Sequence, residues 1–120
     1  MIAVQIKNAV DAFIHKYKIK EALIATSEGI PVYYYKNGRR TSEDPYVLSA
    51  KISSVLEMAR SMSRGLKHVL VNDRYGRAFL VANDEYVFHM YLSNNSEYKD
   101  STIISNAKRL LTNIKKIANS

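Results

Sequence analysis

The stretch from Asp44 to Gly65, DPYVLSAKISSVLEMARSMSRG, is the feature that most constrains how this chain can fold. Asp44 can accept a hydrogen bond from the amides of a first helical turn, and Pro45 suits the first helical position, where its missing N–H is not needed. Gly65 suits a left-handed exit from a helix. These end signals predict one long helix between them.

The predicted helix carries an apolar stripe and, opposite to it, a face of small side chains. At about 100° per residue the stripe predicts contact with a core. It comprises Leu48, Ile52, Val55, Ala59 and Met62, flanked by Leu56 and Met58. The opposite face collects Ser49, Ala50, Ser53, Ser54 and Ser61, with Glu57, Arg60 and Arg64 among them. Small side chains let another backbone come close, so we expect a partner on each side of the helix; a solvated outer face is the alternative.

Length and composition indicate one domain that spans residues 1–120. A chain of 120 residues with 47% hydrophobic residues can bury a core of its own. Because the sequence has no cysteine, disulfides and thiolate metal sites are excluded, and the cytoplasm is the expected compartment. The first thirteen residues, MIAVQIKNAVDAF, mix polar side chains into the apolar ones, so we expect neither a signal peptide nor a membrane span.

The formal net charge of +7 would suit nucleic acid, an anionic membrane or an acidic protein. The basic residues are scattered in small groups, which favours a solvated basic surface. Aromatic and basic residues gather only at Tyr33, Tyr34, Tyr35, Lys36, Arg39 and Arg40. Because a strand alternates its faces, three consecutive tyrosines cannot form one base-stacking platform. The sequence therefore disfavours nucleic-acid binding, and an amphipathic edge strand is the preferred interpretation.

The remaining elements follow from apolar periodicity. Stripes of apolar residues predict helices over 2–17 and over a last segment that Asp100 or Ser101 caps and that ends at 118. Short apolar runs bounded by turn residues predict strands over 22–26, 30–35, 68–72, 77–82 and 86–92. The strands 22–26 and 86–92 are apolar on both faces, which is typical of central strands. Pro31 places its strand at an edge of the sheet.

This order resembles the roadblock, or dynein-light-chain-like, family in its stand-alone prokaryotic, MglB-like type, over essentially the whole chain. Three segments carry the resemblance: ALIATSEGI at 22–30, DPYVLSAKISSVLEMARSMSRGLKHVLV at 44–71 and NDRYGRAFLVA at 72–82. The segment from Tyr33 to Arg40 is bulkier and more basic than is usual in the family. The turn from Asn83 to Glu85 lacks the glycine often found there.

The resemblance implies an α+β sandwich of order αββαβββα, roadblock/profilin-like. A five-stranded antiparallel sheet carries the first and last helices on one face and the long central helix on the other. Five strands span about 20 Å, whereas one helix is only about 10 Å wide, so one face is left partly bare. The family covers it by homodimerisation, with antiparallel central helices and paired edge strands. The resemblance places near the two-fold axis Ser49, Ile52, Ser53, Leu56, Arg60, Val69 and Val71.

No motif supports catalysis or a cofactor. Walker, Rossmann, nucleophile-elbow and zinc-protease patterns are absent, and His15 and His89 have no neighbouring ligand in sequence. We expect His89 to be a hydrogen-bonded core residue, no metal site, and no enzymatic activity.

The resemblance implies a scaffold or regulator of a small Ras-like GTPase. Candidate contacts with that partner are Glu57, Arg60 and Arg64, and Arg39 and Arg40 for its phosphates. Two alternatives stay open: a basic dimer that binds nucleic acid, and a structural subunit of a larger assembly without effect on GTP hydrolysis.

Overall fold

The computed structural model describes residues 1–37, 44–94 and 96–120. Within them lie three helices and five strands in the predicted order. They are α1 (Ile2–Tyr17), β1 (Glu21–Thr26), β2 (Pro31–Lys36), α2 (Pro45–Met62), β3 (His68–Asn72), β4 (Gly76–Ala82), β5 (Tyr86–Ser93) and α3 (Asp100–Ala118). No helix among these residues is both long and apolar enough to cross a membrane.

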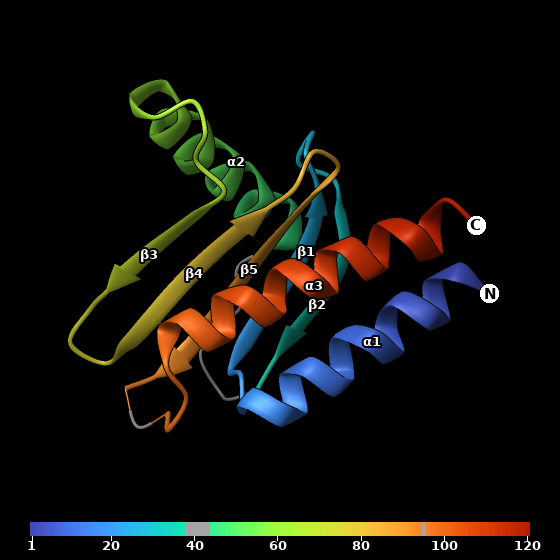
Figure 1. Cartoon of the computed structure of the whole chain (residues 1–120), viewed down its shortest axis with the longest axis horizontal. Coiled ribbons are helices and arrows are strands. Elements are labelled where there is room, and N and C mark those ends of the chain that lie inside the picture. Colours follow the sequence, from blue (N-terminus) through green and yellow to red (C-terminus); the bar gives the residue numbers. More distant parts are fainter. Residues whose placement is uncertain (38–43, 95) are drawn as a thin grey trace.

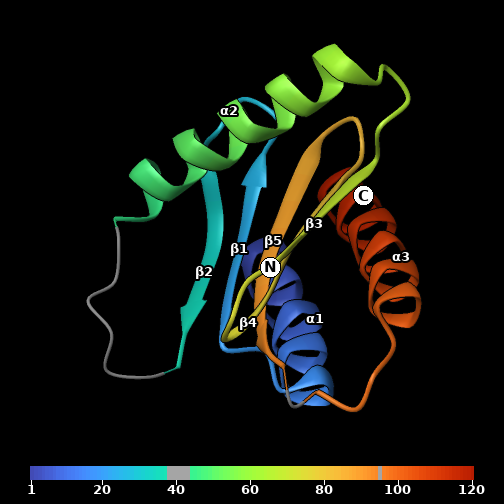
Figure 2. The same cartoon turned by 90° about the vertical axis from the view of Figure 1, so that its left-hand side faces the viewer.

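The five strands form one antiparallel sheet in the order β2-β1-β5-β4-β3. Helices α1 and α3 lie side by side on one face, and α2 crosses the other face alone (Figures 1 and 2). The predicted fold class and layers are therefore confirmed. Strands β1 and β5 are interior, and β2 begins at Pro31 on an edge, as predicted.

The strand register explains why β1 and β5 are apolar on both faces. Ile24, Phe88 and Val81 stand opposite one another and point into the core beneath α1 and α3. The next residues along the strands, Leu23, His89 and Leu80, form a row on the face that α2 shares. Because side chains alternate between faces, each interior strand must supply apolar groups to two layers.

The N-terminus of α2 and the first turn of the sheet follow the sequence predictions. The Asp44 carboxylate accepts a hydrogen bond from the Tyr46 N–H at 2.7 Å, and Pro45 occupies the first helical position. Gly29 adopts φ +90°, and its N–H donates to the Thr26 carbonyl at 2.9 Å. Only glycine takes this conformation without strain, so the β1–β2 hairpin depends on it.

Two predicted helix ends were wrong. Helix α2 ends at Met62 on an extended Ser63, and Gly65 has no left-handed φ, because the chain turns toward β3 before reaching it. Helix α3 begins at Asp100 with Lys99 in the capping position and no side-chain cap. The Asp100 carboxylate instead pairs with the Arg77 guanidinium of β4, which ties the start of α3 to the sheet.

A polar contact joins α1 to the edge strand β2. The Tyr33 hydroxyl donates to the Asp11 carboxylate, which also accepts from the Lys7 ammonium at 2.9 Å. The hydrogen bond from Tyr33, and then that from Lys7, lowers the pKa of Asp11. Burial and the neighbouring Asp11 raise the pKa of Tyr33 to about 12. The contact therefore requires an ionised Asp11 and a neutral Tyr33.

Tyr33→Phe should lower the free energy of unfolding by about 1 kcal/mol near neutral pH, because Asp11 loses a donor. Since the folded state raises the pKa of Tyr33 from 10.0 to about 12, the stability that Tyr33 contributes is complete below pH 10 and is lost as the pH rises toward 12. Urea unfolding of both proteins should show the gap closing across that interval. The exposed Tyr75→Phe is the control; a gap that stays constant to pH 12 would contradict the assignment.

Candidate protein interaction surface

Helix α2 is rotated about its axis relative to the sequence prediction. The residues that it buries against the sheet are Ser49, Ile52 and Leu56. At about 100° per residue, this line lies roughly 70° from the stripe expected from the sequence. The predicted placement of Ser49 on the outer face was wrong, and so was the burial expected of Val55 and Met62, which are exposed.

The rotation leaves an apolar strip along one flank of α2. Val55, Met58 and Met62 recur at helical spacing and are 46%, 69% and 85% exposed. Ser53 lies on the other flank, where its Oγ comes within 3.3 Å of the place that a Cβ on Gly29 would occupy. Since Val55 is about 200° away from Ser53, the apolar strip faces away from the β1–β2 turn and toward the open part of the sheet.

The part of the sheet that α2 does not cover is formed mainly by β3 and its neighbours. Helix α2 packs chiefly over β1 and β2, and in the described part of the chain most of β3 has no helix over it on this face (Figure 2). Val71 of β3 is 54% exposed, and Val69 is half-buried. Among the described residues β3 pairs only with β4, and unlike β2 it carries no proline or bulge that would block a further strand. The exposed flank of α2 (Val55, Met58 and Met62) and the unpaired edge of β3 (with Val71) therefore lie on the same side of the sheet. We refer to these two features together as the bare corner.

His89 lies on the same face of the sheet, between Leu23 and Leu80. Burial lowers the pKa of His89, with a smaller opposing effect from Glu21. The expectation of a hydrogen-bonded core histidine was wrong for one nitrogen, because Nδ1 has no hydrogen-bond partner in the described part of the chain. His89 therefore completes the row beneath α2, in surroundings that disfavour its charged form.

The sequence-predicted interface residues divide into two groups. Ser49, Ile52 and Leu56 pack inside their own protomer and present almost no surface. Ser53, Arg60 and Val69 are half-buried, and Val71 is exposed. The structure thus brings only part of the predicted set to the surface. Val55, Met58 and Met62 were missed because their apolar spacing alone is equally consistent with a core.

The sequence-predicted partner contacts also lie around α2. Glu57 is exposed on the outer face of the helix, and Arg64 is exposed just after its end. Arg60 and Arg64 line a cleft between α2 and α3. Arg39 and Arg40 lie outside the described residues. The structure therefore brings Arg60 and Arg64 together and leaves Glu57 as the charged group on the outward face.

At the level of sequence, no protein-family model and no curated protein matches this chain. The fold has close counterparts among solved structures. MglB described with a tetrameric arrangement superimposes with a TM-score of 0.84 at 7% identity, over 99% of this chain and 91% of that one. The gliding protein MglB from Thermus thermophilus gives 0.83 at 7% identity, over 99% and 92%. A Roadblock/LC7 domain from Streptomyces avermitilis gives 0.68 at 9% identity, over 85% and 87%. The chain therefore has the MglB and Roadblock/LC7 fold that the sequence resemblance predicts.

Ser49→Ala should raise the free energy of unfolding by about 1 kcal/mol, because the Ser49 hydroxyl is fully buried without a hydrogen-bond partner in the described residues. Urea unfolding at one fixed protein concentration measures the change. Ser54→Ala is the matched control: it is exposed on the same helix, its hydroxyl donates to the Ala50 carbonyl at 3.0 Å, and its effect should stay within about 0.5 kcal/mol. A loss of stability in Ser49→Ala beyond that of the control would mean that the Ser49 hydroxyl is hydrogen-bonded.

Proposed function

We propose that this chain is a non-enzymatic homodimer that acts as a scaffold or regulator of a small Ras-like GTPase in the cytoplasm. The observation that carries the proposal is the bare corner formed by the apolar flank of α2 and the edge of β3, in a fold shared with MglB. Scattered apolar residues are ordinary on a protein surface, but an aligned strip beside an open strand edge is typical of an interface.

A second copy of the chain fits this corner. A two-fold axis beside β3 would extend one sheet into the other through antiparallel β3 strands, and would lay the two α2 helices side by side. Each apolar flank, with Val55, Met58 and Met62, would then be covered by its own image, which is the self-complementary contact that a symmetric dimer requires. Val69 and Val71 would lie close to the axis. Ser49, Ile52 and Leu56 would support the interface from below by holding α2 on the sheet.

The GTPase is assigned to the outward side of the paired helices. After dimerisation, the outer face of α2 would still expose small residues together with Glu57, and Arg64 would follow at its end. A surface of small side chains lets a partner approach closely, and the charged residues give it specificity and a fast encounter. The identification of the partner as a small GTPase rests on the family resemblance. Arg39 and Arg40 are further candidates for contacts with the phosphates of its bound nucleotide.

The dimer is tested with Met58→Glu and Val71→Glu, each of which puts a charge on an exposed apolar position. Wild-type protein should sediment as a dimer at micromolar concentration. Each variant should weaken association by more than about thirtyfold, as expected for a central interface residue. Val4→Glu on α1 is the matched control, because it adds the same charge to an exposed valine on the opposite face. A wild-type chain that sediments as a monomer throughout would overturn the dimer.

The partner is tested by pulldown with Ras-like GTPases loaded with GTP analogue or GDP. Glu57→Lys and Arg64→Glu should each reduce capture at least about tenfold if these charges meet the GTPase. Glu97→Lys and Arg74→Glu make the same charge reversals at exposed positions away from α2 and should leave capture unchanged. Sedimentation of all four variants as dimers separates loss of the partner from loss of the dimer.

Comparison of GTP turnover with and without the dimer then separates a regulator from a purely structural subunit. A turnover rate that the dimer does not change, with binding intact, would assign the scaffold role. Full capture by both Glu57→Lys and Arg64→Glu would remove this face of α2 as the binding site.

A further inference from the structure

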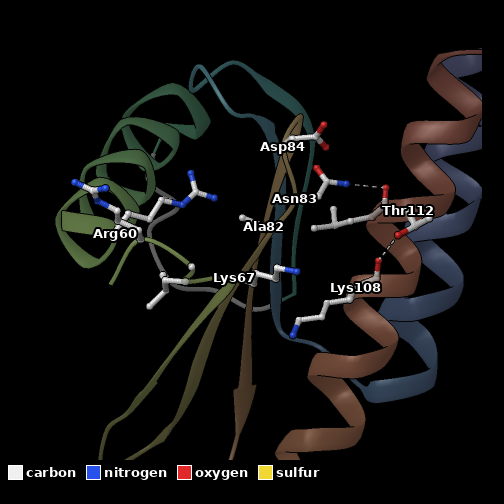
Figure 3. Close-up of a pocket in the computed structure, with 11 residues that line it drawn as sticks. Arg60, Lys67, Ala82, Asn83, Asp84, Lys108 and Thr112 are labelled. Atoms are coloured by element: carbon white, nitrogen blue, oxygen red, sulfur yellow. Dashed lines mark hydrogen bonds between the residues drawn. The ribbon is translucent and has the colours of Figure 1, made fainter. Parts of the chain in front are cut away.

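A cleft of about 620 Å³ lies between the end of α2 and the middle of α3, beside the β4–β5 turn (Figure 3). Four basic residues contribute to its lining: Arg60, Arg64, Lys67 and Lys108. They come from three separate parts of the chain, namely α2, the segment that leads into β3, and α3. We refer to this space as the cationic cleft.

Within the described residues, the positive charge of the cationic cleft is not neutralised by acidic side chains. Asp84 is the acidic residue in its lining, and Asp84 is already held by the ammonium group of Lys115 at 2.9 Å. Within the described part of the chain, none of the four basic residues of the cleft forms an ion pair within 4.0 Å. Like charges that share one cleft repel one another, and an anion placed among them would remove that repulsion.

The walls of the cleft are held in place by hydrogen bonds. The Asn83 side chain donates to the Leu111 carbonyl of α3 at 3.3 Å, and accepts from the N–H groups of Glu85 and Tyr86 at 2.9 and 2.7 Å. The Lys67 carbonyl accepts from the Ala82 N–H at 2.9 Å, which fixes the chain from which the Lys67 side chain projects. In Figure 3 the ammonium ends of Lys67 and Lys108 extend into the gap between the sheet and α3.

A smaller cavity of about 350 Å³ continues along α3 and shares Lys108 and Thr112 with the cationic cleft. It adds Arg109 and Lys116 to the basic lining. The positive surface therefore extends beyond a site for one small ion. No aromatic residue lines either cavity within the described part of the chain, so neither offers the base stacking by which proteins hold single-stranded nucleic acid.

We propose that the cationic cleft binds a compact polyanion built of phosphate groups, carried either by a free phosphorylated compound or by a lipid headgroup. Arginine forks bind phosphate oxygens in pairs, and lysine ammonium groups add point charges, so two of each match a ligand with several phosphates. The volume of the cleft lies in the range of ordinary small-molecule sites. The cleft shares Arg60 and Arg64 with the surface around α2 considered for the GTPase, whereas Lys67 and Lys108 lie outside that surface and allow the two proposals to be tested separately.

The test uses inorganic tripolyphosphate as the probe and isothermal titration calorimetry at one fixed ionic strength. Wild-type protein should bind the probe saturably. The double variant Lys67→Gln with Lys108→Gln should weaken binding at least about tenfold, because it removes two charged donors. The double variant Lys16→Gln with Lys99→Gln is the matched control: it removes the same charge from exposed lysines outside the cleft and should bind like wild type.

Vesicle flotation distinguishes the two sources of phosphate. A lipid headgroup is supported if the protein binds vesicles that contain phosphatidylglycerol or phosphatidylinositol phosphate but does not bind vesicles of phosphatidylcholine alone. The double variant Lys67→Gln with Lys108→Gln should then abolish this vesicle binding. Binding to tripolyphosphate without flotation supports a free compound. The absence of both, or an equal loss in the control pair, overturns the proposal.

Single-stranded RNA is the competing polyanion. RNA binding that is tighter than tripolyphosphate binding and grows with RNA length would also overturn the proposal, in favour of a nucleic-acid surface. The double variant Lys67→Gln with Lys108→Gln should capture the GTPase as well as wild type does. Polyanion binding by the cleft and GTPase binding by α2 are therefore tested independently of each other.

Discussion

The structure depends on a mismatch between the width of the five-stranded sheet and the width of the helices that cover its two faces. Five strands are about twice as wide as one helix. On one face two helices, α1 and α3, fill that width and bury the larger core. On the other face α2 stands alone over β1 and β2, so β3 and the flank of α2 toward it stay open (Figure 2). The surface we assign to a second copy follows from this asymmetry.

The charged and the apolar surfaces occupy different places. The apolar strip of α2, with Val55, Met58 and Met62, faces the open sheet. The cationic cleft lies between the end of α2 and α3, and it combines Arg60, Arg64 and Lys67 with Lys108, which is distant from them in sequence. Only Arg60 and Arg64 belong to both the α2 surface and the cleft. The apolar strip that we assign to a second copy and the basic site that we assign to an anion therefore use different side chains of one short chain.

Much of the fold was predictable from the sequence, because local signals and the global fold agree. The elements fell within one or two residues of their predicted bounds. Two predictions of helix ends failed: at Gly65 the chain changes direction before reaching it, and at Asp100 a tertiary contact outweighed the local preference for capping. Asp100 could have capped its helix, but Arg77 of β4 offers a charged partner.

The candidate site was less predictable than the fold. The sequence determined that a long helix with a broad apolar arc follows Asp44, because spacing along the chain fixes which residues share a side of a helix. The sequence could not determine which part of that arc is buried within the protomer, because the same apolar spacing is expected for a helix in a core and for a helix in an interface. Tertiary packing decided it: the helix rests on Ser49, Ile52 and Leu56, and Val55 turns outward. The cationic cleft likewise exists only in three dimensions, because Lys67 and Lys108 are brought together by β3 and α3 rather than by sequence.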